Sequence, residues 1–274
     1  MKKDKNGLTE AEFLKQYKIT DFERPSVAVD NLLFAIDETE NNNIRKLGEK
    51  KLQVLLVKRD EHPYIDLWSL PGTFVRLNEA LEDASIRCLK NKTKIKDMYL
   101  EQLYTFGDVD RDPRTRVLSI SYVGLINKKR TSLNDDSNKT SWFTLKTSPT
   151  ASDGVCEMTL EGENGVVIKA KIKTDNGSII MTEAKNLAFD HAKVIFYGLN
   201  RIRNKLEYTD IAFSMLEKQF TMAELKQVYE AILDKKLSKA NFQRKIKNKA
   251  QSLGIYKTGG FRPAILYKYK DSSQ

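Results

Sequence analysis

The chain of 274 residues has little of what marks secreted, disulfide-bonded or membrane proteins. Its two cysteines, Cys88 and Cys156, are far apart, so the sequence indicates neither a disulfide framework nor a zinc-ligand spacing. No apolar run approaches the roughly 18 residues that cross a bilayer, and the start of the chain lacks the apolar core of a secretion signal. We therefore expect a cytoplasmic protein with no membrane partner.

Excess positive charge is almost absent from residues 1–199, which hold only +1 of the total net charge of +10. Between Asn200 and Gln274, 16 Lys and Arg stand against 7 Asp and Glu, a net charge of +9. A charge confined to one segment favours a polyanionic partner for that segment. The alternative to a polyanion-binding segment is a solvated lysine-rich surface. A DNA-binding fold in the same segment would be needed to argue against that alternative.

The length and the 40% of hydrophobic residues predict more than one domain. A short helix is expected over Thr9–Tyr17 within a polar N-terminal extension. Runs rich in Val, Leu and Ile predict buried strands at Ser26–Asp37 and Lys51–Arg59. Further strands are predicted at Leu100–Phe106 and Val117–Ile126, with a last strand of the sheet around Trp142, Phe143 and Leu145.

The segment Trp68–Ile95 begins with a Pro-Gly pair and continues with apolar residues at helical spacing, which predicts a strand, a tight loop and a helix. It resembles a Nudix box, written G-x5-E-x7-R-E-U-x-E-E-x-G-U, where U is a bulky aliphatic residue. Glu79 and Arg87 match, and Leu89 and Ile95 fill aliphatic positions. The resemblance implies an α/β (α+β) Nudix sandwich of a mixed sheet and helices.

The other positions of the box depart from the pattern. Thr73 replaces the first glycine, Cys88, Asn91 and Lys92 replace three glutamates, and Lys94 replaces the last glycine. In families that keep the pattern, these glutamates hold a divalent metal against a pyrophosphate, because Mg²⁺ takes hard oxygen ligands. We therefore expect that hydrolysis is lost and that no cofactor is required. If activity survives, Mg²⁺ is needed and Glu79 is catalytic.

The loop between the third and fourth predicted strands packs three Asp and three Arg into residues 107–116. These groups either grip a phosphate or supply metal oxygens, or they pair with one another in a turn bent by Pro113. The segment resembles the Gly-Asp-x-Asp-Arg-Asp-Pro-Arg loop of Nudix-related transcriptional regulators, which favours a ligand-facing role. The ligand-binding candidates are Arg59, Arg76, Glu79, Arg87, Asp108, Asp110 and Arg111.

Alternating apolar residues are interrupted at two turns, Glu163–Gly165 and Asp175–Gly177, each of which contains an Asn-Gly pair. This pattern predicts a β-meander, which we treat as an insertion. A helix is predicted over Asn186–Leu206, and its sequence resembles the linker helix of the same regulators. His191 lies near the start of that helix, and a lone histidine there is taken as structural. The predicted domains are 1–24 extension, 25–148 Nudix domain, 149–184 meander, 185–206 linker helix and 207–274 winged helix.

The basic tail has the order of a winged helix. Thr221 and Glu224 have the spacing of a capping box before one amphipathic helix. A second helix is expected from Ser238, with Phe242, Ile246 and Ala250 as its buried stripe. Strands at Leu253–Lys257 and Ala264–Lys270 would form the wing. The predicted DNA contacts are Lys239, Gln243, Arg244, Lys247 and, in the wing, Arg262.

The resemblance implies a homodimeric transcriptional regulator, a repressor, that binds double-stranded operator DNA. Its Nudix pocket would sense a small phosphorylated effector, ADP-ribose or a related NAD-pathway or sugar metabolite. One alternative is an active Nudix pyrophosphohydrolase in which Glu79 and Asp108 or Asp110 hold the metal. Another is an adaptor that binds nucleotide and protein but no DNA. Lys92 is either a solvated lysine on the helix, which is the favoured interpretation, or a replacement for part of a lost metal charge if the pyrophosphate ligand is kept.

Overall fold

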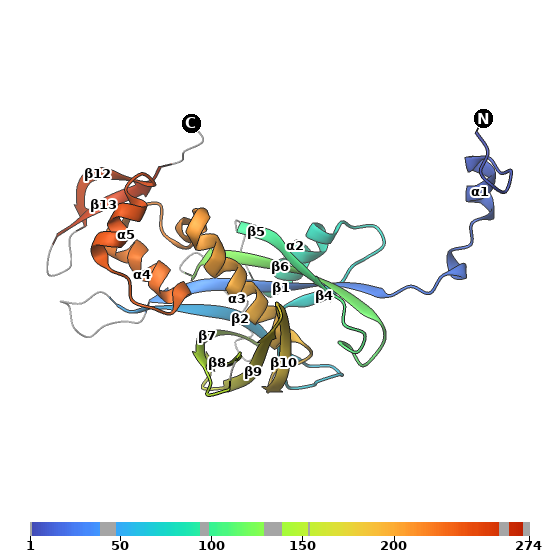
Figure 1. Ribbon diagram of the computed structural model, residues 1–274, viewed down its shortest axis with the longest axis horizontal. Coiled ribbons are helices and arrows are strands. Elements are labelled where there is room, and N and C mark those ends of the chain that lie inside the picture. The colour runs from blue at the N-terminus through green and yellow to red at the C-terminus, as the bar shows by residue number, and fades with distance from the viewer. Residues whose placement is uncertain are drawn as a thin grey trace.

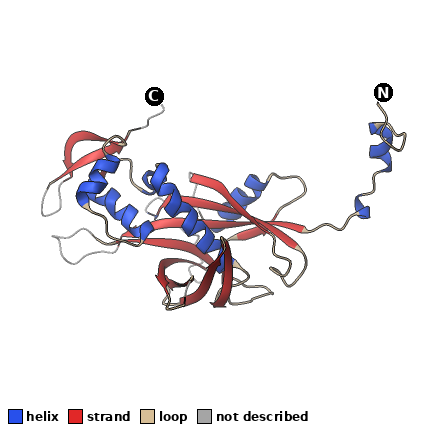
Figure 2. Cartoon of the chain, viewed as in Figure 1, coloured by secondary structure: helices blue, strands red, loops and turns tan. Residues whose placement is uncertain are grey.

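The structure is a computed structural model that describes residues 2–38, 48–93, 99–128, 139–152, 154–257 and 263–270. A long central sheet carries one helix on each face, a small winged domain lies at one end, and the N-terminus extends away at the other end (Figure 1). Helices, strands and loops are distinguished in Figure 2. No helix in the described parts of the chain is long and apolar enough to span a membrane.

The large sheet is mixed and has the strand order β10-β9-β8-β7-β2-β1-β6-β5. Its central strand β1 pairs in parallel with β6 and antiparallel with β2, as expected for a mixed Nudix sheet. Short strands β3 (Trp68–Ser69) and β4 (Gly72–Phe74) pair with β2 and β1. The strands of the main path are β1 (Ser26–Glu38), β2 (Lys50–Lys58), β5 (Tyr99–Phe106), β6 (Val117–Asn127), β7 (Thr140–Pro149), β8 (Val155–Gly162), β9 (Val167–Asp175) and β10 (Ser178–Lys185).

Strand β1 is buried on both faces because its side chains alternate between two hydrophobic clusters. Leu32, Phe34 and Ile36 belong to the cluster that includes helix α3 (His191–Tyr208). Leu33 and Ala35 pack with Leu89 of helix α2 (Leu81–Lys92) on the opposite face. The apolar run in β1 is continuous because the strand lies between two helices and is covered on both faces.

The prediction that a strand around Trp142 ends the sheet is wrong. Strand β7 pairs with β8 along its length, from Phe143 with Gly162 to Pro149 with Cys156, and β9 and β10 extend the sheet further. The meander joins the sheet because alternate residues of β9, such as Ile168 and Ile172, are buried in the same core as α3. Its hairpin at Asn176–Gly177 is confirmed, with positive φ at both residues.

The linker helix α3 begins at His191 and not at the predicted Asn186. The peptide of Trp68 holds the preceding segment in an extended form, because its N–H donates to the carbonyl of Asn186 and its carbonyl accepts from Ala188. Asn186 and Phe189 both have positive φ, which a right-handed helix does not allow. Contacts with a strand more than a hundred residues earlier therefore delay the helix start.

The winged-helix prediction is confirmed in its order of elements. Strand β11 (Phe220–Thr221) leads into α4 (Met222–Leu233), which has the predicted capping box, and α5 (Lys239–Ile246) follows. Strands β12 (Ala250–Lys257) and β13 (Ala264–Tyr269) complete a sheet of order β11-β13-β12. The prediction that Ala250 belongs to the second helix is wrong, because α5 ends at Ile246 and the backbone turns into β12.

The N-terminal arm, residues 2–25, holds the predicted short helix as α1 (Glu10–Gln16) with a capping box at Thr9, followed by a 3₁₀ turn (Ile19–Asp21). It contacts the body only through its connection to β1 in Figure 1, and none of its helical residues is buried. The winged domain differs, because α4 packs on β2 and shares one hydrophobic core with α3 and the large sheet. A second 3₁₀ turn (Ile211–Met215) joins α3 to that domain.

Candidate functional site

A cavity of about 270 Å³ lies where β1, β2, the short strands β3 and β4, loop 107–116 and the start of α3 meet. Three arginines line it, Arg59, Arg111 and Arg114, together with the aromatic rings of Phe74 and Phe189. We call it the arginine-lined cavity. Guanidinium groups and ring faces suit a ligand that combines anionic groups with a flat ring.

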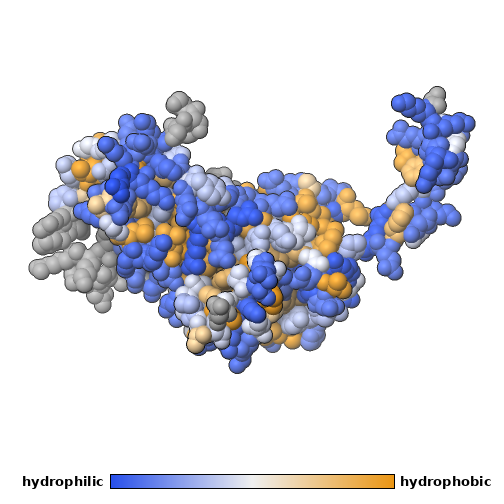
Figure 3. Space-filling model, in the orientation of Figure 1, coloured by the Kyte–Doolittle hydropathy of each residue, from blue (hydrophilic) through white to orange (hydrophobic). Residues whose placement is uncertain are grey.

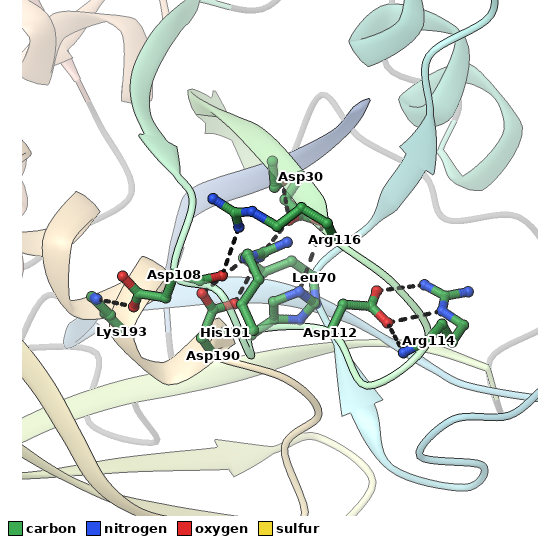
Figure 4. A network of polar contacts seen from close by, with 11 residues as sticks. Asp30, Leu70, Asp108, Asp112, Arg114, Arg116, Asp190, His191 and Lys193 are labelled. Carbon is green, nitrogen blue, oxygen red and sulfur yellow. Dashed lines mark hydrogen bonds and ion pairs between the residues drawn. The ribbon is translucent and has the colours of Figure 1, made fainter. Parts of the chain in front are cut away.

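A buried ionic network forms the floor of the cavity (Figure 4). Arg111 donates from Nη2 and Nε to both carboxylate oxygens of Asp190, at 2.7 and 3.1 Å, and its Nη2 lies 3.5 Å from Asp30 Oδ2. Burial alone would lower the pKa of Arg111, but the hydrogen bonds and charge of Asp190, followed by the charge of Asp30, raise it overall. The network therefore keeps Arg111 charged while its side chain is only 4% exposed.

Asp30 itself is held by close packing. Its carboxylate accepts a hydrogen bond from Ser119 on β6. Gly72 lies so near that a Cβ at this position would be 2.3 Å from Asp30 Oδ1. The approach of this carboxylate, and not the backbone conformation, therefore favours glycine at position 72, since Gly72 has no positive φ.

His191 joins the network from the first residue of α3. The backbone N–H of Leu70 donates to its Nδ1 at 2.9 Å, so Nε2 carries the proton and lies 3.7 Å from Asp30 Oδ1. Complete burial lowers the pKa of His191, which keeps the ring neutral near pH 7. The histidine thus has the structural role expected from the sequence, but it also lines the cavity.

The rim of the cavity is made of cations stacked on aromatic rings. The Arg59 guanidinium lies 4.9 Å from the centre of the Phe189 ring, and Arg114 lies 5.2 Å from that of Phe74. Arg114 also binds Asp112 through both Nε and Nη2. Arg114 was absent from the predicted ligand contacts, although it is the last arginine of the loop segment that carries the family resemblance.

The predicted ligand-binding residues separate into two groups. Arg59 and Arg111 line the cavity, whereas the other candidates lie outside its lining. Asp108 forms an ion pair with Lys193 of α3 at 2.6 Å, and Asp110 is exposed. Loop 107–116 therefore contains both arrangements expected from the sequence, since Asp112 and Arg114 pair within it while Arg111 reaches into the cavity.

The Nudix-box residues close on one another beside α2. Arg87 donates to both carboxylate oxygens of Glu79, at 2.6 and 2.9 Å, and also to the carbonyl of Phe74. The hydrogen bonds from Arg87, and then that from the Arg76 backbone, lower the pKa of Glu79 to about 2. Both oxygens of the one matching glutamate are thus engaged by protein donors.

These residues do not fit a Mg²⁺ site. Cys88 is buried, and among the described residues no three His, Cys, Asp or Glu side chains gather closely enough to hold a metal. The side chain of Lys92 and the predicted box residues Lys94 and Ile95 lie outside the described residues.

The predicted DNA-contacting residues gather on one exposed face. Lys239, Gln243 and Arg244 project from α5, and Lys247 follows its last residue, all with exposed side chains. Phe242 and Ile246 anchor the helix from its buried side, with Phe242 packed edge-on against Tyr229 of α4. Arg262 lies outside the described residues.

Comparisons with known proteins find relatives of both the large sheet domain and the winged domain. The NUDIX domain family matches residues 44–153, and the family of the NrtR DNA-binding winged helix domain matches residues 212–269. The ADPR responsive transcriptional repressor NtrR of Acinetobacter baylyi is 30% identical over 269 residues, which cover 96% of this chain and 90% of that protein.

Two solved structures are similar over most of the chain. A MutT/nudix family protein from Enterococcus faecalis has a TM-score of 0.70 and 29% identity, and covers 96% of this chain and 94% of its own. Shewanella oneidensis NrtR complexed with a 27mer DNA has a TM-score of 0.64 and 26% identity, with 89% and 93% covered. Coverage of 96% means that the similarity extends through the β-meander, which the family resemblance in the sequence did not obviously include.

Proposed function

The chain belongs to the family of NrtR-type ADP-ribose-responsive transcriptional repressors, and from this premise we propose that it binds operator DNA through α5 and ADP-ribose in the arginine-lined cavity. The observation that carries the proposal is the pairing, in one chain, of this cavity with an exposed basic helix in a winged domain.

Recognition of ADP-ribose is supported by the chemistry of the cavity. Its diphosphate is an anion that guanidinium groups bind through paired hydrogen bonds, and its adenine offers a ring for stacking on the aromatic rim. The cavity is smaller than the roughly 300–1,000 Å³ of typical ligand pockets. Part of an ADP-ribose molecule would therefore extend beyond it, past the exposed guanidinium of Arg114.

We place no metal in this recognition. Glu79 is engaged by Arg87, and the box supplies no further carboxylates at the positions of Cys88 and Asn91. Purified protein incubated with ADP-ribose and Mg²⁺ is expected to leave the ligand intact. Turnover on the order of 1 per second, an ordinary enzymatic rate, would instead favour the hydrolase alternative.

Binding of DNA by α5 is supported by the exposed Lys239, Gln243, Arg244 and Lys247, which reach either phosphates or base edges. An operator is first selected from a random duplex library by repeated binding to the full chain. Affinity for this duplex is expected to fall as salt rises, because phosphate contacts release counterions. ADP-ribose is expected to change the affinity about fivefold or more, the usual range of coupling. An affinity that ADP-ribose leaves unchanged would contradict the proposal.

A homodimer is part of the proposal, and the N-terminal arm supports it. The arm exposes a cluster of apolar side chains, visible as orange patches on the detached segment in Figure 3. These residues are Phe13, Leu14, Tyr17, Ile19 and Phe22. An isolated seven-residue helix is unstable in water, so packing of the arm on a second copy would stabilise it. Light scattering of the full chain is expected to give a dimer, and the mass of a monomer would contradict it.

A further inference from the structure

Helix α3 spans the distance between the cavity and the winged domain. Asp190 immediately precedes the helix and His191 is its first residue, so these two members of the buried network sit at one end. Arg203 lies twelve residues further on, roughly 18 Å along the axis at 1.5 Å per residue. Between them, Gly198 packs directly on β1, where a Cβ would be 2.1 Å from Leu32 Cδ2. The helix is thus a rigid element whose two ends meet the two sites.

Arg203 joins three parts of the molecule at the far end of α3. Its Nε donates to the carbonyl of Ile232 in the last turn of α4 at 2.8 Å, and its Nη2 donates to Thr147 Oγ1 on β7 at 3.1 Å. The last four carbonyls of a helix have no partner within the helix, and a cation is favoured at that end by the helix dipole. Arg203 therefore caps a winged-domain helix from outside that domain.

Arg203 differs from an arginine in an ordinary ion pair in how little nearby negative charge compensates for its burial. Burial lowers its pKa, and the charge of Asp234 raises it only in part. Among the described residues, its hydrogen bonds go to neutral oxygens and no carboxylate lies within ion-pair distance. Arg203 is half-buried, and a cation with part of its hydration removed is unfavourable unless its hydrogen bonds are kept, so any displacement of α4 from α3 breaks contacts that stabilise it.

We infer that Arg203 is the positioning residue through which ligand in the cavity acts on the winged domain. This inference rests on the proposed function. A ligand that changes the contacts of Arg111 with Asp190 shifts the start of α3, and Arg203 passes that shift to the end of α4, which packs against the DNA-facing α5. Such a ligand switches DNA binding only if its affinity differs between the two positions of α3.

The test compares Arg203→Met with Arg201→Met in the full chain. Arg201 is a matched control because it lies on the same helix and donates to a backbone carbonyl, that of Leu103 on β5, without touching the winged domain. Three quantities are measured: the affinity for ADP-ribose, the affinity for the selected operator, and the ratio of operator affinities with and without ADP-ribose. Arg203→Met is expected to move that ratio toward 1, by about fivefold or more, while ADP-ribose affinity stays within about twofold. Arg201→Met is expected to keep the wild-type ratio.

Thr147→Val provides a second variant if Arg203→Met fails to fold, because it removes one acceptor of Arg203 and leaves the guanidinium in place. It is expected to move the ratio toward 1 by a smaller factor. A wild-type ratio in Arg203→Met, or in Thr147→Val where only that variant folds, would overturn the inference alone. So would a loss of ADP-ribose binding in Arg203→Met. Absence of any ADP-ribose effect in the wild-type protein would instead overturn the proposed function, and the inference with it.

Discussion

The start of helix α2 and the arginine-lined cavity both hold arginine–carboxylate pairs, yet the two regions place them in different surroundings. Glu79 and Arg87 belong to one loop-helix unit and remain partly exposed, at 13% and 23% of their side chains. Arg111 joins Asp30 and Asp190, which come from a strand and a helix far apart in the chain, and is 4% exposed. The first pair organises a local motif, whereas the second holds three segments together.

This difference bears on which of the two regions binds a charged ligand. At α2 both oxygens of the matching glutamate, Glu79, accept hydrogen bonds from Arg87. At the cavity, Arg59 and Arg114 rest on the aromatic rings of Phe189 and Phe74, and each is also held by hydrogen bonds to residues near it in the chain. We therefore propose that an anion binds at the cavity rather than at the box helix.

The largest effect is expected from breaking the buried network. Arg111→Met leaves Asp190 and Asp30 buried without their cation, which typically costs about 3–5 kcal/mol. Urea denaturation measures the loss in the free energy of unfolding. Arg116→Met is the control in the same loop, since Arg116 is exposed and should change stability by about 0.5 kcal/mol or less. Equal losses in the two variants would show that the network does not differ from a surface contact.

A smaller effect is expected at the rim. Phe189→Ala removes the ring under Arg59, and aromatic and cation–π contacts are each worth about 1 kcal/mol. The dissociation constant for ADP-ribose, measured by calorimetry, should rise about fivefold for a loss of about 1 kcal/mol, since 1.4 kcal/mol corresponds to a factor of ten. Tyr208→Ala, an exposed aromatic at the other end of α3, should leave it unchanged. Unchanged affinity in Phe189→Ala would exclude the rim from the ligand site.

A pH effect is expected from His191. Its pKa in the folded chain lies below the ordinary 6.5 because the ring is buried, so the unfolded chain binds the proton first as the pH falls. Stability is therefore retained above about pH 6.5 and is lost progressively below it. His191→Gln should reduce this slope in urea denaturation series, whereas His62→Gln, at an exposed position, should preserve it. A slope that survives in His191→Gln would assign the effect to other groups.

The smallest effect is expected at the box. Arg87→Gln removes the main donors to Glu79, and the pKa of that carboxyl should rise from about 2 toward the ordinary 4.5, as followed by NMR titration. Glu79→Gln should leave the affinity for ADP-ribose unchanged because Glu79 lies outside the cavity lining. Loss of ADP-ribose binding in Glu79→Gln would show that the box contributes to the ligand site, as its place among the predicted contacts suggests.

Some parts of the fold and site were predictable because their signals are local. The capping box of Thr221 with Glu224 and the Asn176–Gly177 turn depend on residues within a few positions of one another. Arg59 was a candidate at the end of a predicted buried strand, and Arg111 was a candidate in the charged loop that resembles the family's. Asp30 and Asp190 were missed, because Arg111 meets them across 81 and 79 residues and no local pattern marks a carboxylate as its partner.

The sequence by itself determined the continuous burial of β1, the alternation of buried and exposed residues in β9, the caps of α1 and α4, the basic face of α5 and the incomplete Nudix box. Each follows from side chains that are neighbours along one strand or one helical turn. Only the tertiary structure decided that the meander extends the large sheet, that Trp68 delays the start of α3 to His191, and that the carbonyl of Ile232 accepts from Arg203. These features depend on burial and hydrogen bonding between distant segments, whose free energies exist only once the segments have packed together.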